Sequence, residues 1–308
     1  MIPHPGPELV LSASRRTDIP AFYLDWFMDH IKQESFNVTN PYTRKTKKIK
    51  VKPAHFHSIV FWSKNYDEFI QTRAGEKLLE QGFHLYFNFT INSESLILEP
   101  NIPPLKNRLN QLKQLSEKFG PQTISWRFDP ICFFHTNENT LTRNNLSDFS
   151  KIADCSASLG IQKCVTSFLD PYKKIDRRLE CLKQQKKINL VFTQPTMDNK
   201  KQVIQKMTNE LTSKGISLLL CCERDVFTHL EDLCGVQENA CIDGKGLKSI
   251  FKGNPEVRRD YGQRPKKGCQ CTKSIDIGSY DRHPCFHNCL FCYANPDIDN
   301  MTKKINVQ

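Results

Sequence analysis

The sequence predicts an α/β protein whose core is a TIM-barrel-like parallel β/α barrel, complete or incomplete, followed by an irregular cysteine-rich segment. Apolar runs of four to eight residues alternate with amphipathic stretches of 12 to 16 residues, which is typical of a parallel sheet with helical crossovers. About seven such runs occur, which favours a barrel, with an open doubly wound sheet as the alternative. No GxGxxG or GxxxxGKS sequence follows a predicted strand, so dinucleotide-binding and P-loop folds are not expected.

The predicted elements follow one another in a regular order. Each strand is a short apolar or alternating run, and the strands are expected at 8–13, 36–40, 58–62, 84–91, 123–128, 163–169 and 217–222. The helices are expected at 21–33, 67–81, 105–119, 145–159, 174–187 and 200–214. Pro20 stands near the start of the first helix, where proline is tolerated, and a glycine closes four of the others, at Gly82, Gly120, Gly160 and Gly215. Residues 44–52 hold six basic residues and no acidic residue, and we expect a charged hairpin there.

The chain changes character towards its C-terminus. Periodicity fades from residue 254 onward. We therefore expect a barrel-like domain over 1–253 and, over 254–308, a segment that is ordered by whatever its cysteines bind and that packs on the barrel.

Composition and charge limit the classes of protein. The chain has 308 residues, with 44 Lys and Arg against 33 Asp and Glu, a net charge of +11. This excess allows an anionic substrate, and nucleic acid is one such partner, although no standard nucleic-acid-binding motif is present. No run of 18 apolar residues and no signal peptide is found, so a cytoplasmic protein without a membrane span is expected.

The cysteines are unevenly distributed. The chain has 13, and five of them fall within the last 40 residues. Thiols stay reduced in the cytosol, so this concentration indicates metal binding or redox chemistry rather than a disulfide framework.

Three of these cysteines form a CxxxCxxC motif, namely Cys285, Cys289 and Cys292. Three thiolates so close together can bind three irons of a [4Fe–4S] cluster and leave the fourth iron without a ligand from the motif. An open iron can bind S-adenosylmethionine, and reduction then releases a radical. The alternative is a zinc ribbon in which Cys269 or Cys271 is the fourth ligand.

Cys269 and Cys271 form a CxC pair upstream of this motif. One of them can close the cluster, which would leave no room for S-adenosylmethionine. Alternatively, both join Cys222 and Cys241 in a second metal site that holds a second cluster or zinc. The simplest alternative is that Cys221 and Cys222 are buried apolar residues.

Seven stretches give the chain a family resemblance. They are SASRRTDIPAFY (12–23), VFWSKN (60–65), FNFTIN (87–92), WRFDPI (126–131), CID (241–243), QRPKKGCQCTKSIDIGSY (263–280) and CFHNCLFCYANP (285–296). The chain resembles a bacterial family catalogued as domain of unknown function 1848 over nearly its full length. The cysteine cluster of that family is similar to the cluster-binding motif of radical S-adenosylmethionine enzymes. In those enzymes the motif follows the first barrel strand, whereas here it follows the last clear strand.

Polar residues at the strand ends are the candidates for a substrate pocket, because active sites of barrels lie at the carboxyl ends of their strands. We expect Asp18 and Glu223 to act as catalytic base or cofactor anchor. The predicted substrate-binding residues are Arg15, Arg16, Lys64, Asn65, Arg127 and Asp129. The arginines suit a carboxylate or phosphate, although strand ends are also often polar because they meet solvent.

The sequence thus predicts an iron–sulfur protein, a radical S-adenosylmethionine-like enzyme of unidentified substrate that takes electrons from a donor such as a flavodoxin or ferredoxin. The alternative is a non-catalytic protein with a closed cluster or a zinc site, acting in electron transfer, as a structural module or in nucleic-acid binding.

Overall fold

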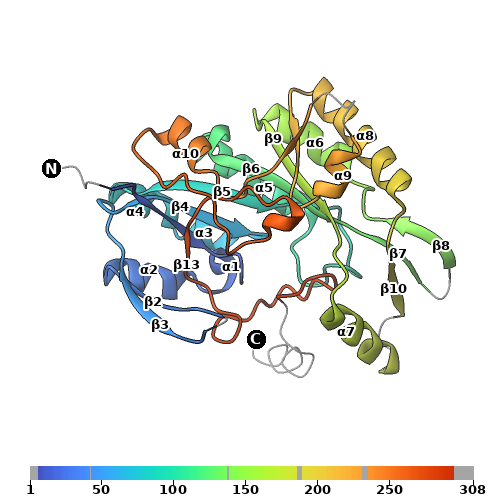
Figure 1. Cartoon of the computed structure of the whole chain (residues 1–308), viewed down its shortest axis with the longest axis horizontal. Coiled ribbons are helices and arrows are strands. Elements are labelled where there is room, and N and C mark those ends of the chain that lie inside the picture. Colours follow the sequence, from blue (N-terminus) through green and yellow to red (C-terminus); the bar gives the residue numbers. More distant parts are fainter. Residues whose placement is uncertain (1–5, 42, 137–138, 186–188, 231–234, 295–308) are drawn as a thin grey trace.

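A computed structural model describes residues 6–41, 43–136, 139–185, 189–230 and 235–294. Its main feature is a sheet of eight strands in the order β12-β11-β9-β6-β5-β4-β1-β13, in which all neighbouring strands are parallel (Figure 1). The strands are β1 (Leu9–Ala13), β4 (Phe56–Ser63), β5 (His84–Thr90), β6 (Ile124–Ile131), β9 (Lys163–Phe168), β11 (Ser217–Leu220), β12 (Val236–Glu238) and β13 (Ile275–Asp276). The predicted parallel α/β fold is therefore confirmed.

The sheet is wound in one direction. From β1 to β12 each strand lies beside the preceding strand of the sheet, and the order does not reverse as it does in a doubly wound sheet. β12 and β13 form its two edges, and among the described strands no hydrogen-bonded pairing joins β12 to β13. The strand pairs of the described residues therefore form an open parallel sheet with a one-way strand order.

Ten helices lie within the described residues. They are α1 (Ile19–Phe22), α2 (Leu24–Lys32), α3 (Asp67–Gln71), α4 (Ala74–Glu80), α5 (Leu105–Phe119), α6 (Phe149–Ser158), α7 (Lys173–Gln184), α8 (Met197–Ser213), α9 (Arg224–Thr228) and α10 (Gly244–Phe251). None of the helices in these residues is long and apolar enough to cross a membrane.

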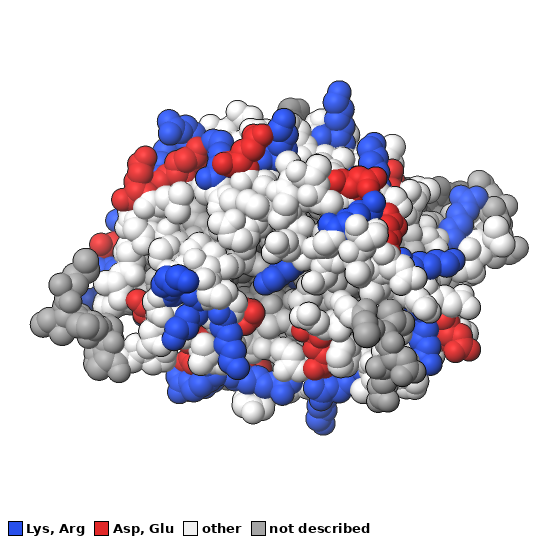
Figure 2. Space-filling model, turned by 90° about the horizontal axis from the view of Figure 1, so that it is seen from above, with Lys and Arg blue, Asp and Glu red and all other residues white. Residues whose placement is uncertain are grey.

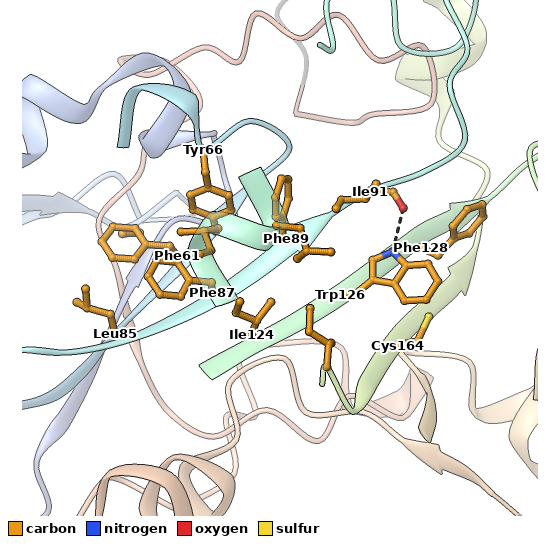
Figure 3. Close-up of a cluster of buried hydrophobic side chains, with 14 of the residues drawn as sticks. Phe61, Tyr66, Leu85, Phe87, Phe89, Ile91, Ile124, Trp126, Phe128 and Cys164 are labelled. Carbon is orange, nitrogen blue, oxygen red and sulfur yellow. Dashed lines mark hydrogen bonds between the residues drawn. The ribbon is translucent and has the colours of Figure 1, made fainter. Parts of the chain in front are cut away.

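Strand alternation divides the sheet into two different faces. On β4, β5 and β6 one set of side chains packs into the main hydrophobic core with the helices (Figure 3), and its members are Ile59, Phe61, Leu85, Phe87, Phe89, Ile124, Trp126 and Phe128. Burying each of these is worth about 2 kcal/mol. The opposite face carries buried polar groups, among them Ser58, Asn88, Ser125 and Arg127. This second face is the one available for chemistry.

Two predicted helices are broken in the structure. The helix expected at 21–33 begins earlier, at Ile19, where Asp18 caps the first turn by accepting from Ala21 N–H at 3.0 Å, and it is divided into α1 and α2 at Tyr23, whose φ of −138° is not helical. The helix expected at 67–81 is divided before α4, where Arg73 adopts a left-handed φ of 54°.

The predicted strand 36–40 lies outside the main sheet. It forms β2 (Ser35–Thr39), which pairs antiparallel with β3 (Thr46–Lys50) in a separate hairpin. Within the expected charged hairpin over 44–52 only β3 forms, and its partner β2 is the strand that was predicted at 36–40. The hairpin therefore begins earlier in the chain than expected. A further small sheet was not predicted, and it consists of β7 (Phe133–Thr136), β8 (Asn139–Asn144) and β10 (Leu190–Thr193).

The segment after β12 crosses from one edge of the sheet to the other. α10 packs over the polar face, where Ile242 and Leu247 contact Val10, Val60 and Tyr86. The chain then passes the start of β1, with Glu256 N–H bonded to Glu8 O at 2.8 Å, and forms β13 beside β1. Residues 295–308 of the predicted cysteine-rich segment lie outside the described residues.

Candidate metal centre

The CxxxCxxC loop brings its three thiols together on one turn. Cys285 and Cys289 are buried and Cys292 is half-buried. Asn288 adopts a left-handed φ of 57°, and Cys292 N–H bonds to Cys289 O at 3.1 Å. Backbone N–H groups also point at sulfur, because His287 donates to the Cys285 thiol and Ala294 donates to Cys292 Sγ at 3.4 Å.

The loop is held by its backbone. Four carbonyls in and beside the loop accept from three side chains that come from separate parts of the chain. Tyr23 Oη donates to Pro284 O at 2.7 Å, Asn101 Nδ2 donates to Phe286 O at 2.9 Å, and Arg178 Nη1 donates to Leu290 O and Cys292 O at 3.0 Å each. The tail is therefore fixed over the ends of β1, β5 and the start of α7.

Asp18 joins this loop to the sheet. One carboxylate oxygen caps α1, and the other accepts from Ser63 Oγ at 2.9 Å, Lys64 N–H at 2.9 Å and His287 Nε2 at 2.7 Å. The structure places the predicted catalytic Asp18 as an anchor of the loop, because its oxygens are already engaged.

Lys64 is placed beside the same loop. Its ammonium pairs with Glu99 Oε1 at 2.5 Å and lies 5.3 Å from the centre of the Phe291 ring. Glu99 Oε1 is also 3.8 Å from Cys289 Sγ. Burial raises the pKa of the Cys285 and Cys289 thiols, and the charge of Lys64 opposes that rise. A half-buried cation thus already faces the position where thiolate charge would collect.

Two buried polar atoms of the loop are without a partner. They are His287 Nδ1 and Asn288 Oδ1, and buried polar atoms of this kind normally bind water, an ion or a ligand. In the described part of the chain, no three His, Cys, Asp or Glu side chains converge on a point as ligands of one metal ion would. Thiolates that bind different irons of a cluster need no such common point.

A second group of thiols lies near the other end of the same sheet edge. Cys221 and Cys222 follow β11, Cys241 follows β12, and Cys269 and Cys271 precede β13. Cys222 makes a hydrogen-bond contact with Cys269, and Cys241 makes one with Cys271. The structure therefore brings together all four residues of the predicted second site and adds Cys221.

Two predicted substrate-binding arginines face these thiols. Arg127 Nη1 donates to Cys241 Sγ at 3.2 Å and Nη2 pairs with Asp129 at 2.5 Å. Arg15 contacts the Cys271 thiol. The guanidinium carbons of Arg127 and Arg15 lie 5.4 and 5.5 Å from the centre of the Trp62 ring, so both arginines contact the same indole.

The remaining predicted site residues are dispersed. Arg16 donates to Gly278 O at 2.9 Å, and Asn65 accepts from Gln111 Nε2 at 2.8 Å beside α5, so both act in packing. Glu223 accepts from Phe168 N–H at 2.8 Å, and burial raises its pKa to about 7. That pKa suits a general base at neutral pH.

A cavity of about 410 Å³ opens on the polar face of the sheet beside the second thiol group. Its lining includes Tyr86 and Asn88 of β5, Cys241, and the charged residues Lys245 and Arg259. A pocket that joins polar side chains to a thiol can hold a small polar ligand.

Sequence reasoning missed two residues beside the CxxxCxxC loop. Glu99 lies in an irregular stretch, and Cys132 is fully buried in the apolar cluster that also contains Cys289 and Phe291. Neither stands in a motif with the loop, so only the three-dimensional contact identifies them. The signal present in the sequence was an acidic residue and a cysteine shortly after two predicted strands.

Comparison with known families decides the relationship. The model of the family described as "Domain of unknown function (DUF1848)" matches residues 10–294. The chain belongs to this family. The match covers both thiol groups, and the predicted resemblance to domain of unknown function 1848 is thereby confirmed.

Solved structures give weaker likenesses. A D-hydantoinase from a Bacillus sp. AR9 is 10% identical, with a TM-score of 0.30 over 66% of this chain and 39% of its own. A dihydropyrimidinase from Brevibacillus agri NCHU1002 is 9% identical, with a TM-score of 0.31 over 66% and 38%. Another D-hydantoinase is 10% identical, with a TM-score of 0.31 over 77% and 61%. The chain spans less than two thirds of the length of each, and no curated protein matches it.

Proposed function

We propose that this DUF1848 protein is an iron–sulfur enzyme of the radical S-adenosylmethionine type, in which Cys285, Cys289 and Cys292 hold a [4Fe–4S] cluster. The observation that carries the proposal is one loop that holds three thiols within eight residues, with N–H groups directed at sulfur and the half-buried ammonium of Lys64 alongside. When bound and reduced, such a cluster supplies an electron that cleaves the sulfonium of S-adenosylmethionine and starts radical chemistry.

The position of the loop supports this proposal. The motif comes late in the chain, yet its His287 is hydrogen-bonded to Asp18 and the neighbouring Pro284 to Tyr23, and both partners lie in the segment between β1 and α2. In radical S-adenosylmethionine enzymes the motif follows the first strand of a barrel. We propose that the tail of this chain returns to the equivalent place in an incomplete barrel.

The ligand of the fourth iron distinguishes a radical S-adenosylmethionine enzyme from a non-catalytic protein with a closed cluster. Cys269 and Cys271 contact Cys222 and Cys241, so the pair is engaged away from the loop. A closed electron-transfer cluster would need another protein ligand, and Glu99 and Cys132 are the described side chains that lie beside Cys289. Our proposal assigns neither of them to the cluster.

The proposed partners follow from this chemistry. A one-electron donor such as a flavodoxin or ferredoxin would reduce the cluster. The polar cavity of about 410 Å³, with Lys245 and Arg259 in its lining, is the proposed site of an anionic substrate. Figure 2 shows a face on which basic side chains gather along the lower margin while acidic and basic side chains mix elsewhere.

Low-temperature electron paramagnetic resonance tests the proposal. The full chain is reconstituted anaerobically, reduced with dithionite, and measured with and without S-adenosylmethionine. We expect a cluster signal that shifts when S-adenosylmethionine is added, and we expect Cys289→Ala to lose that shifting signal while Cys155→Ala, a thiol of α6, retains it. A cluster signal that does not shift when S-adenosylmethionine is added would identify a closed site and overturn the proposal. Loss of the loop cluster in Cys132→Ala or Glu99→Gln would do the same.

A further inference from the structure

We propose that the second thiol group holds an iron–sulfur cluster of its own, bound by Cys222, Cys241, Cys269 and Cys271. This inference does not depend on the proposed function, because it concerns thiols that the CxxxCxxC loop does not contain. The argument rests on the arrangement of the thiols, on the charges around them and on their place in the fold.

The five thiols form a closed ring of contacts. Cys221 lies 3.3 Å from Cys241 and 4.0 Å from Cys222, sulfur to sulfur. Cys222 contacts Cys269, and Cys269 contacts Cys271. Cys271 contacts Cys241 and completes the ring. The shorter of the two measured separations is well above the length of a disulfide bond, about 2.05 Å, and the described cysteines are all free thiols.

The ring is assembled from distant parts of the chain. Its thiols come from the ends of β11 and β12 and from the segment that leads into β13. β12 and β13 are the two edges of the main sheet. The ring therefore brings together segments from both edges, which no strand pairing among the described residues connects directly. A metal centre here would link these edges, as structural metal sites do where a core is incomplete.

The charges around the ring suit an anionic centre. Four thiolates around an iron–sulfur core carry net negative charge, and each ligand thiol loses one proton when it binds. Arg127 donates to Cys241, and Arg15 stands beside Cys271 with no carboxylate paired to its guanidinium among the described residues. Asn239 Nδ2 also donates to Cys241 Sγ, at 3.0 Å. Buried cations and hydrogen bonds to sulfur stabilise such clusters and tune their potential.

The contacts favour a cluster over a single zinc ion. Zinc needs four ligands around one point, and in the described residues no three candidate ligands stand in that geometry. Each of the two pairs of contacting thiols, Cys222 with Cys269 and Cys241 with Cys271, instead suits one iron of a two-iron [2Fe–2S] cluster. The cluster would border the polar cavity, because Cys241 is part of its lining.

Metal and sulfide analysis of the anaerobically reconstituted full chain tests the proposal. We expect about 6 iron and about 6 sulfide per chain in the wild type, about 4 of each in Cys241→Ala/Cys271→Ala, and about 2 of each in Cys285→Ala/Cys289→Ala/Cys292→Ala. The matched control Cys155→Ala/Cys181→Ala removes two thiols outside both groups and should keep the wild-type content.

Several results would overturn the proposal. They are a wild type with about 4 iron that Cys241→Ala/Cys271→Ala leaves unchanged, one zinc per chain that the same variant loses, or a disulfide among the five thiols. If that variant instead removes all the iron and the loop variant removes none, the proposed function fails while this inference stands.

A second measurement covers the case in which a variant fails to fold. Cys222, Cys241, Cys155 and Cys181 are all half-buried, so their alkylation rates in the loaded wild type can be compared by peptide mapping. We expect Cys222 and Cys241 to react at least tenfold more slowly than the other two until an iron chelator is added. Equal rates before chelation would contradict the proposal.

Discussion

The two thiol groups of this chain differ in how they are built. In the CxxxCxxC loop, three cysteines lie within eight residues and a single turn brings their side chains together. In the ring, five cysteines come from three segments that only the completed sheet places side by side. The first site is therefore a local structure that is anchored to the fold, and the second is a product of the fold.

Their surroundings differ as well. The loop faces Lys64 and Glu99, an ion pair of opposite charges, whereas the ring faces the guanidinium groups of Arg15 and Arg127. Lys64 and Arg127 are both paired with a carboxylate, so the ring differs from the loop in having one cation, Arg15, that pairs with no carboxylate among the described residues. This difference fits a closed anionic centre at the ring and a centre with a free coordination position at the loop, as we propose.

The largest effect is expected from Lys64→Met, which breaks the buried ion pair beside the loop. Glu99 is 4% exposed, so its carboxylate would be left buried without a cation, at a cost of about 3–5 kcal/mol. Urea unfolding monitored by circular dichroism measures this loss. Lys113→Met is the control, because its pair with Glu117 is about 60% exposed on both sides and is worth less than about 1 kcal/mol.

The same variant sharpens the comparison of the two sites. We expect Lys64→Met to lower the iron bound by the loop and to leave the iron of the ring unchanged. An equal loss of iron from the loop and from the ring would contradict our description of them as two separate sites.

A smaller effect is expected from Arg178→Met, which releases two carbonyls of the loop. Arg178 is 3% exposed and donates to Leu290 O and Cys292 O. Leaving these acceptors unsatisfied costs about 1–3 kcal/mol, and the loop should lose its iron several-fold faster to a chelator, as followed by absorbance. Arg177→Met, an exposed neighbour on α7, should not change that rate. If both variants release iron at the wild-type rate, Arg178 does not hold the loop.

The fold could be predicted where its causes are local. Short apolar runs, and alternation at 84–91, identified six of the eight strands of the main sheet, because residues such as Leu85, Phe87 and Phe89 pack into the core on one face. β12 and β13, with three and two residues, could not be predicted, because strands so short exist only through pairing with β11 and β1. The strand at 36–40 was assigned to the wrong sheet, since its apolar pattern does not specify its partner.

The candidate site, like the fold, could be predicted where its causes are local and could not be predicted where it depends on tertiary contacts. The spacing of Cys285, Cys289 and Cys292 predicted a metal loop without any tertiary information. Cys269 and Cys271 were expected to join either that loop or a separate site, and their contacts with Cys222 and Cys241 favour the separate site. Strand-end position predicted that Arg127 lies at the sheet edge, but a thiol as its partner could not be predicted, because that partner is 114 residues away.

The smallest effect is expected from His84→Gln at the opposite end of the sheet, where α10 of the ring-bearing segment is attached. His84 stacks on Phe251 with ring centroids 4.8 Å apart, and partial desolvation of its ring together with nearby His57 lowers the pKa of His84. The unfolded chain therefore binds this proton more readily than the folded chain, so stability falls as pH drops through the ordinary histidine pKa of about 6.5. His84→Gln should reduce the loss of stability between pH 8 and pH 6 by less than about 0.5 kcal/mol, because the side chain is exposed. Urea midpoints at the two pH values measure the difference, with the exposed His229→Gln as control. A pH dependence that His84→Gln leaves at the wild-type value would show that proton binding at His84 is not linked to the attachment of α10.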